Sequence, residues 1–271
     1  MPAPTEITSA QLYRLVGTAH CPAIVDLRID ADFDDDPRVI PSSRRFGFND
    51  IDAMVSEFPD RSVVVYCQKG KKISQGAAAL LRARGVKAET LLGGHFAWRD
   101  SGYPMIPSGK LTREGKQTGL WVTRHRPKID RIACPWLIRR FVDPAATFLF
   151  VPPADVFDVA ERFGAEPFDM DQGFWTHRVD RCTFDTMIEE FNLEFPALKE
   201  LAVVVRGADI NQHDLSPQSA GLLAVSLGMS RMYRDDLEQL DACMPIYDAL
   251  YRWCRDAMDE NHDWPVKERS K

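Results

Sequence analysis

One cysteine, Cys67, stands where a reactive thiol is expected. It follows the apolar run of residues 63–66 and opens a polar loop, after which a helical pattern begins. That loop consists of Gln68, Lys69, Gly70, Lys71 and Lys72. The amino end of a helix and free loop N–H groups favour an anion, and the three lysines add positive charge. These features lower a thiol pKa and make the thiolate a nucleophile. A buried, inert cysteine is the alternative interpretation.

A second group of side chains could bind a metal ion. His177, Cys182 and Asp185 lie within nine residues of one another, and Asp169 is a further carboxylate upstream. Imidazole with thiolate suits Zn or Fe, whereas imidazole with carboxylate suits Mn or Fe. Because the spacing matches no closed zinc motif, packing or hydrogen bonding is the competing interpretation. If a metal binds, we expect His177 to be a ligand.

Cationic side chains crowd residues 124–140. Seven of these seventeen positions are Arg, Lys or His, and the candidates for an oxyanion site are Arg124, Arg131 and Arg139. Guanidinium groups match oxyanions through paired N–H donors. A solvated helix face with carboxylate partners such as Asp130 and Asp143 explains the same charges.

The elements around Cys67 alternate between strand and helix. Strand-like runs occur at residues 23–27, 63–66 and 88–92, and helical patterns at 51–57, 73–84 and from 96. This alternation predicts a parallel sheet with helices on its faces. Active groups in such sheets lie at the carboxyl ends of strands. Cys67 and Asp26 both occupy such ends.

The composition changes in the middle of the chain. Residues 104–119 contain Pro, Ser, Gly and Lys with few large apolar side chains, which is typical of a linker. We therefore predict an α/β parallel-sheet domain at 1–108, a linker at 109–119 and a mainly α (α+β) domain at 120–271. In the second domain an extended piece is expected at 147–151. Helical patterns cover 129–141, 154–163, 183–191, 196–205, 217–227 and 237–258.

The overall composition is that of an ordinary globular protein. Of 271 residues, 45% are hydrophobic and 27% charged, and the net charge of -6 argues against a strongly basic nucleic-acid-binding domain. No apolar run approaches the roughly 20 residues of a membrane helix, and the first residues do not resemble a signal peptide. Six widely spaced cysteines without a Cys-x-x-Cys pair do not suggest a disulfide scaffold. A cytoplasmic, reducing location is expected.

Three segments of the first half together resemble the rhodanese family of sulfurtransferases. They are residues 24–28 (IVDLR), 64–72 (VVYCQKGKK) and 91–98 (LLGGHFAW), the last followed by Gly102-Tyr103-Pro104. The resemblance covers roughly residues 5–106. It implies a rhodanese-like fold with Cys67 as the nucleophile and residues 68–72 as the active-site loop. Asp26 and Arg28 would then have a supporting, mainly structural role.

The resemblance also implies a reaction that needs no cofactor. The thiolate takes a sulfane sulfur from a small-molecule donor, and a thiophilic acceptor such as a thiol or cyanide removes it. Lys72 stands where the family loop often ends in Arg; it keeps the charge but loses the bidentate fork, which leaves the donor undecided. Cysteine phosphatases and arsenate reductases usually have Arg six positions after the cysteine. Ile73 occupies that position here, so we disfavour their chemistry.

From Trp121 onward the chain resembles the C-terminal domain of chromate resistance proteins of the ChrB type. Residues 121–144 carry most of the resemblance, which continues at 168–169 and 177–184 and more weakly at 206–209 and 247–250. It implies a setting of chromate or oxidative stress more than a mechanism.

Together these observations predict a sulfurtransferase with a persulfide on Cys67, coupled to a chromate-resistance-associated domain. Two alternatives stay open. One is a sensor or binding protein for an oxyanion, chromate or sulfate, without turnover. The other is a redox enzyme of the second domain that uses Zn, Fe or Mn. Neither a membrane nor a nucleic acid is an expected partner.

Overall fold

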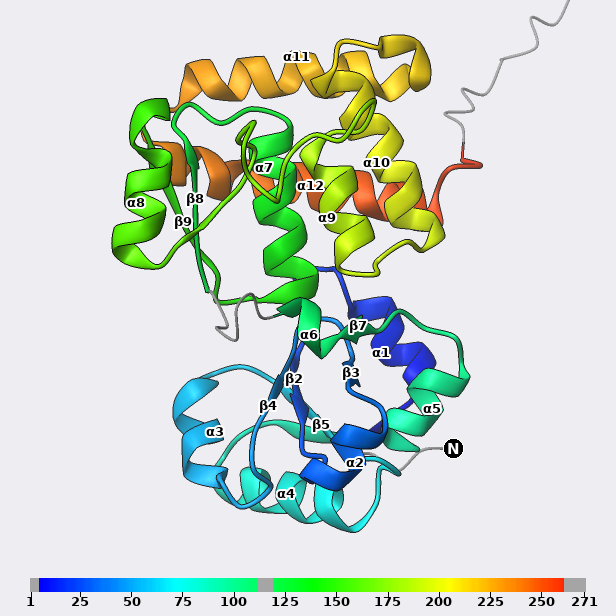
Figure 1. Cartoon of the computed structure of the whole chain (residues 1–271). Coiled ribbons are helices and arrows are strands. Elements are labelled where there is room, and N and C mark those ends of the chain that lie inside the picture. Colours follow the sequence, from blue (N-terminus) through cyan, green and yellow to red (C-terminus); the bar gives the residue numbers. More distant parts are fainter. Residues whose placement is uncertain (1–4, 112–118, 261–271) are drawn as a thin grey trace, which may run out of the picture.

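A five-stranded parallel sheet forms the centre of the N-terminal half (Figure 1). The computed structural model describes residues 5–111 and 119–260. In sheet order the strands are β1 (Glu6–Ile7), β6 (Ala88–Leu91), β5 (Val63–Tyr66), β2 (Ala23–Asp26) and β4 (Ser43–Arg45). Every residue of β2 and β5 is buried, because helices cover both faces of the sheet as they do in most parallel sheets. The predicted parallel α/β architecture is confirmed.

Alternate residues along the strands serve two different cores. Val63 and Val65 of β5 pack on one face with Ala77 and Leu81, whereas Val64 contributes to the core on the other face. The helices of this half are α1 (Ser9–Leu15), α2 (Asp30–Asp35), α3 (Ile51–Glu57), α4 (Lys72–Ala83), α5 (Gly94–Asp100) and α6 (Ser108–Leu111). A short antiparallel pair joins β3 (Arg38–Val39) to β7 (Ile106–Pro107).

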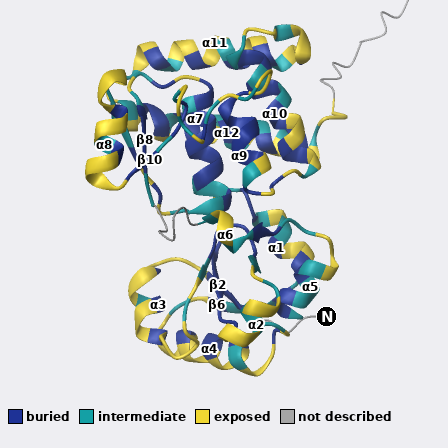
Figure 2. Ribbon diagram, in the orientation of Figure 1, coloured by how far each residue is buried: buried dark blue, intermediate teal, exposed yellow. Residues whose placement is uncertain are grey.

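The C-terminal half is mainly helical, as predicted, around a small parallel sheet. In sheet order its strands are β10 (Glu166–Pro167), β8 (Leu120–Arg124) and β9 (Thr147–Val151). Its longer helices are α7 (Asp130–Leu137), α8 (Val156–Phe163), α9 (Thr183–Glu190), α10 (Pro196–Asp209), α11 (Pro217–Met232) and α12 (Asp236–Asp256). Short turns of π- and 3₁₀-helix are η1 (Ile138–Val142), η2 (Pro153–Asp155) and η3 (His213–Leu215). Figure 2 shows much of α7 buried and the outer faces of α8 and α11 exposed.

The two halves share one continuous hydrophobic core. Phe141 of η1 packs against Tyr251 of α12, and its carbonyl oxygen accepts a hydrogen bond of 2.6 Å from the N–H of Ser42. Ser42 immediately precedes β4, and Ala23 begins β2 beside a hollow that Pro144 also lines. The amino ends of these strands therefore face the helical half, and the carboxyl ends, including Cys67, lie at the opposite edge of the sheet.

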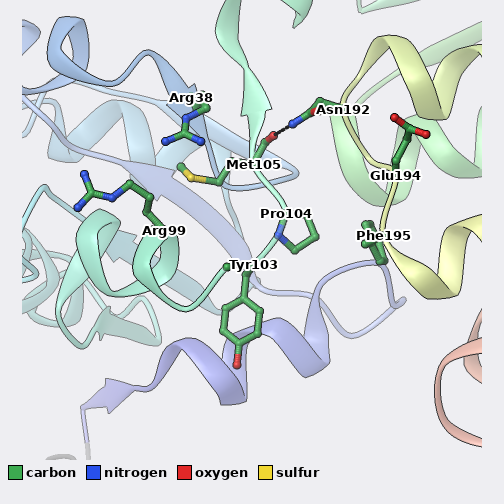
Figure 3. A pocket seen from close by; sticks show the side chains of 9 residues that line it. Arg38, Arg99, Tyr103, Pro104, Met105, Asn192, Glu194 and Phe195 are labelled. Atoms are coloured by element: carbon green, nitrogen blue, oxygen red, sulfur yellow. Dashed lines mark hydrogen bonds between the residues drawn. The ribbon is translucent and has the colours of Figure 1, made fainter.

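A hollow of about 330 Å³ opens between the halves (Figure 3). On one wall Asn192 donates a hydrogen bond of 3.1 Å from its side chain to the carbonyl oxygen of Met105. Nearby, Lys110 of α6 forms an ion pair of 2.7 Å with Glu190 of α9. The predicted linker thus begins within a short helix, and its residues 112–118 lie outside the described residues. None of the described helices is long and apolar enough to cross a membrane.

Candidate functional sites

Cys67 lies at the carboxyl end of β5, directly before the loop that leads into α4. Its residue is 6% exposed, and its Sγ lies 3.3 Å from the hydroxyl of Ser74 and 3.8 Å from the carbonyl oxygen of Lys71. Ser74 belongs to the first turn of α4. The thiol is therefore held against the amino end of a helix, as the sequence pattern predicted.

Two glycines allow the loop to fold tightly around Cys67. Gly70 and Gly94 have φ values of 63° and 59°, in the left-handed region that favours glycine. A Cβ atom on Gly94 would collide with the carbonyl oxygen of Cys67 and the N–H of Gly70. This close approach lets the N–H of His95 donate to the Cys67 carbonyl oxygen at 3.0 Å. The Gly93-Gly94 turn therefore fixes the backbone of the loop that follows Cys67.

The surroundings of Cys67 favour the thiolate. Burial raises the pKa of the thiol, but hydrogen bonds from the Ser74 hydroxyl and from the backbone of Ser74, Lys71 and Lys69 lower it by more, so the pKa lies below its ordinary value. The side chains of Lys69, Lys71 and Lys72 are exposed to solvent. The sequence pattern attributed part of the effect to these lysines, whereas the loop backbone and Ser74 supply the main lowering contributions.

Asp26 and Arg28 form a buried ion pair beside this loop. The Arg28 Nη2 lies 2.6 Å from the Asp26 Oδ2, and both side chains are fully buried. Arg28 also donates to the carbonyl oxygens of Asp36 at 2.7 Å and Arg38 at 2.8 Å. The pair thus ties β2 to the segment after α2, an arrangement in keeping with the structural role expected for both residues.

A second cluster lies in the C-terminal half, around His177. Its Nε2 atom is 3.3 Å from the Asp130 Oδ2, 3.4 Å from the Asp169 Oδ1 and 3.3 Å from the Asp209 Oδ2. Asp130 begins α7 and Asp209 ends α10, whereas Asp169 follows β10 with a left-handed φ of 54°. Segments far apart in the sequence therefore meet at one imidazole.

The close carboxylates shift the titration of this cluster. Hydrogen bonds to Asp130 and Asp169 raise the pKa of His177 to about 10. Burial and the charge of Asp130 raise the pKa of Asp209 to about 7. Burial opposes ionisation of Asp169, but hydrogen bonds from His177 and Arg124 lower its pKa by more.

Two of the three predicted metal ligands, Cys182 and Asp185, are not grouped with His177. Cys182 is the N-cap of α9, and its N–H and thiol donate to the Asp185 Oδ2 at 3.1 Å and 3.3 Å. The other carboxylate oxygen of Asp185 accepts a hydrogen bond of 2.9 Å from the Arg206 side chain. Cys182 and Asp185 are therefore engaged with each other and with Arg206. The structure groups His177 with Asp130 and Asp209 in place of Cys182 and Asp185.

The three candidate oxyanion-binding arginines also separate. Arg124 and Arg131 both approach the Asp169 Oδ2, at 2.7 Å and 3.3 Å. Arg139, in η1, pairs at 2.9 Å with Asp241 of α12. The expected carboxylate partners were different ones, Asp130 and Asp143. Oxyanion binding stays a prediction for Arg124 and Arg131, and Arg139 belongs to another ion pair.

Sequence reasoning missed Ser74, Gly94 as part of the loop cradle, and the placement of Asp130 and Asp209 beside His177. Ser74 was recognisable, because it lies in the first turn of the helix that follows the cysteine. Asp209 carried no such signal, since helical periodicity faded at residue 205 and α10 continues to Asp209.

Comparisons with known proteins assign both halves. A family model for a rhodanese-like domain matches residues 8–101. A sulfurtransferase from Allochromatium vinosum is 31% identical over 106 residues, which cover 97% of that protein and 38% of this chain. The chain belongs to the rhodanese-like family. C-terminal to the rhodanese-like domain, a family model for the ChrB C-terminal domain matches residues 121–254. The predicted fusion of the two domains is therefore confirmed.

Two further proteins are similar to parts of this rhodanese-like chain. Protein ChrB from Cupriavidus metallidurans is 34% identical over 139 residues, which cover 51% of this chain. The match spans only 40% of the length of that ChrB. Among solved structures, a rhodanese-related protein from Thermoplasma volcanium is 22% identical, with a TM-score of 0.33; the match covers 37% of this chain and 96% of that one.

Proposed function

We propose that the protein is a sulfurtransferase that carries sulfane sulfur as a persulfide on Cys67. The observation that carries this proposal is the thiol itself. The thiol has a lowered pKa, it contacts the Ser74 hydroxyl, and backbone groups of Lys69, Lys71 and Ser74 hydrogen-bond to it at the carboxyl end of β5. The same donors that stabilise a thiolate would stabilise the terminal sulfur anion of a persulfide.

The chemistry proceeds in two displacements. The Cys67 thiolate attacks the outer sulfur of a donor such as thiosulfate; a Cys67 S–S bond forms, the donor S–S bond breaks, and sulfite leaves with the electron pair. An acceptor thiolate or cyanide then attacks the outer sulfur of the persulfide. Thiocyanate or a new persulfide forms, and the Cys67 thiolate returns. No electrons are gained or lost overall, so the cycle requires no redox cofactor.

The position of Cys67 favours an acceptor that comes from outside the chain. The amino ends of β2 and β4 face the ChrB domain, whereas Cys67 is at the carboxyl edge of the same sheet. We therefore propose a small thiol or a thiol of another protein as the acceptor. A cytoplasmic location, where such thiols are kept reduced, is part of this proposal.

A turnover assay tests the proposal. The full-length protein receives thiosulfate or glutathione persulfide as donor and cyanide as acceptor, and thiocyanate is measured. Cys67→Ala should reduce turnover by at least about a thousandfold, because the nucleophile is lost. Cys21→Ser, which alters a half-buried thiol away from the loop, should retain turnover. Unchanged turnover in Cys67→Ala would refute the proposal.

The same variant separates the alternatives drawn from the sequence. An oxyanion sensor would bind chromate or sulfate equally well with and without Cys67 and would release no thiocyanate. A metal-dependent redox enzyme of the ChrB domain would also be indifferent to Cys67→Ala. Only the sulfurtransferase loses its activity with this thiol.

A further inference from the structure

We propose that Asp130, His177 and Asp209 bind one divalent transition-metal ion of the Mn²⁺, Fe²⁺ or Zn²⁺ class. This site lies in the ChrB domain and is independent of sulfur transfer by Cys67. It differs from the ligand set expected from the sequence, which paired His177 with Cys182 and Asp185.

The spacing of the three donor atoms fits metal ligands. The three atoms lie within 4.8 Å of one another, and the His177 Nε2 is 3.3 Å from one oxygen of each aspartate. Metal bonds of about 2.0–2.2 Å place neighbouring donors about 2.8–3.1 Å apart in octahedral geometry and about 3.3–3.6 Å apart in tetrahedral geometry. Hydrogen bonds between charged groups are shorter, about 2.7–2.9 Å. The neighbouring ion pairs of Asp169 measure 2.7 Å to Arg124 and 3.3 Å to Arg131.

The number of acceptors around the imidazole points the same way. A single ring N–H donates to one acceptor in good geometry. Here oxygens of Asp130, Asp169 and Asp209 all lie 3.3–3.4 Å from the same Nε2 atom. One proton cannot serve three carboxylates, whereas a cation between the donors can interact with several at once.

The surrounding contacts hold the ligands in place. The two oxygens of Asp130 accept hydrogen bonds of 2.9 Å and 3.0 Å from the N–H groups of Thr183 and Phe184, at the start of α9. Thr183 also donates from its hydroxyl to Asp169 at 3.2 Å. Outer contacts of this kind orient metal ligands in known sites. The His177 side chain is 41% exposed, which gives an ion access and leaves coordination positions for water.

The balance of charge and ligand type selects the ion. Arg124 and Arg131 pair with Asp169, so Asp130 and Asp209 supply the two negative charges that match a divalent cation. One imidazole with two carboxylates suits Mn, Fe or Zn, whereas a soft ion such as Cu(I) would need thiolates. The nearest thiols are directed otherwise: Cys134 contacts Asp130 from the buried side, and Cys182 contacts Asp185.

Titration with Mn²⁺ alone tests the site. Full-length protein is stripped with a chelator and titrated, while the signal of free Mn²⁺ is followed by electron paramagnetic resonance. We expect one Mn²⁺ per chain. His177→Asn and Asp209→Asn should each weaken binding by at least about tenfold, since each removes one ligand. Pulsed electron paramagnetic resonance of the bound Mn²⁺ should show a hyperfine coupling to an imidazole nitrogen. This coupling should be absent in His177→Asn.

Matched controls separate the site from general charge effects. Asp214→Asn removes an exposed carboxylate shortly after Asp209, and His125→Asn removes an exposed imidazole; both should bind Mn²⁺ like the wild type. Cys67→Ala should also leave binding unchanged, so failure of the sulfurtransferase proposal would not affect this one. Circular dichroism verifies folding of each variant, and His177 and Asp209 provide two independent tests. The site is refuted if wild-type protein shows no saturable binding of Mn²⁺ or Zn²⁺, or if folded His177→Asn and Asp209→Asn bind as tightly as wild type.

Discussion

Cys67 and Cys182 both sit at the amino end of a helix, yet their environments drive the two thiols in opposite directions. Hydrogen bonds from Ser74 and the loop backbone bring the pKa of Cys67 below its ordinary value. Burial and the charges of Asp130 and Asp185 raise the pKa of Cys182 well above it. A helix amino end alone therefore does not make a reactive cysteine.

The difference lies in which group uses the free N–H donors. At α9, carboxylate oxygens of Asp130 and Asp185 accept from the N–H groups of residues 182–184. At α4, Lys71 is the N-cap and no side chain caps the helix, so donors in this first turn stay available to the sulfur of Cys67. In the rhodanese-like domain the first turn of α4 contacts the sulfur of Cys67, whereas in the ChrB domain carboxylates occupy the first turn of α9.

Among changes that keep the Cys67 thiol itself, the largest expected effect comes from filling the glycine cradle around it. Gly94→Ala places a Cβ against the Cys67 carbonyl oxygen and the Gly70 N–H, so the loop must shift. A displacement of this kind should lower sulfur transfer by about a hundredfold. The control is Gly76→Ala, on an open face of α4, which should retain full activity. Equal rates of thiocyanate formation in the two variants would mean that the cradle does not position the sulfur.

Selective alkylation compares the thiols directly. Burial raises the pKa of Cys21 and of Cys243 to about 11, whereas that of Cys67 is lowered. Near neutral pH, Cys67 should react with iodoacetamide at least about tenfold faster than either, after allowance for the weaker nucleophilicity of a low-pKa thiolate. Peptide mass spectrometry after a short exposure measures this ratio. Preferential labelling of Cys182 would reverse the comparison.

Removal of the Ser74 hydroxyl should lower the reactivity of the Cys67 thiol in a pH-dependent way. Ser74→Ala loses a hydrogen bond that stabilises the thiolate, so the pKa of Cys67 rises toward its ordinary value. At pH values below the raised pKa, the variant has a smaller thiolate fraction than the wild type, and its alkylation rate should be about three- to tenfold lower. Well above that pKa, the rates of variant and wild type should converge. A pH–rate profile identical to that of the wild type would show that Ser74 does not tune this thiol.

The smallest effect is expected from the lysines. Lys69 and Lys71 are exposed, and it is their backbone groups that contact the sulfur. Because exposed charges are screened by water and salt, Lys69→Met and Lys71→Met should each change the alkylation rate by less than about threefold. A larger fall in the alkylation rate would mean that the lysine charges help to lower the pKa of Cys67, as the sequence pattern suggested.

The parts of the molecule built from long, regular patterns were predictable from the sequence. Residues 63–66 and 51–57 were assigned correctly, and α4 differs from its prediction by one residue at each end. Strands of two or three residues, such as β3 and β10, are too short to show a periodicity. Cys67 could be recognised as a candidate reactive thiol because its strand, loop and helix are contiguous in the sequence.

In the His177 cluster only His177 was predictable, because the residues around it are not contiguous in the sequence. His177 was identified as a candidate ligand, but its neighbours come from the start of α7 and the end of α10. Residues 130 and 209 meet only after the helices have packed, and no local pattern encodes that meeting. Cys182 and Asp185, which are close in sequence, satisfy the start of their own helix instead.

The most direct test of the central claim is the intact mass of the full-length protein after brief treatment with a sulfane-sulfur donor. We predict a gain of about 32 Da, one sulfur atom, that reductant or cyanide removes and that Cys67→Ala does not acquire. Absence of this gain in the wild type, or an equal gain in Cys67→Ala, would contradict the assignment of Cys67 as the sulfur carrier.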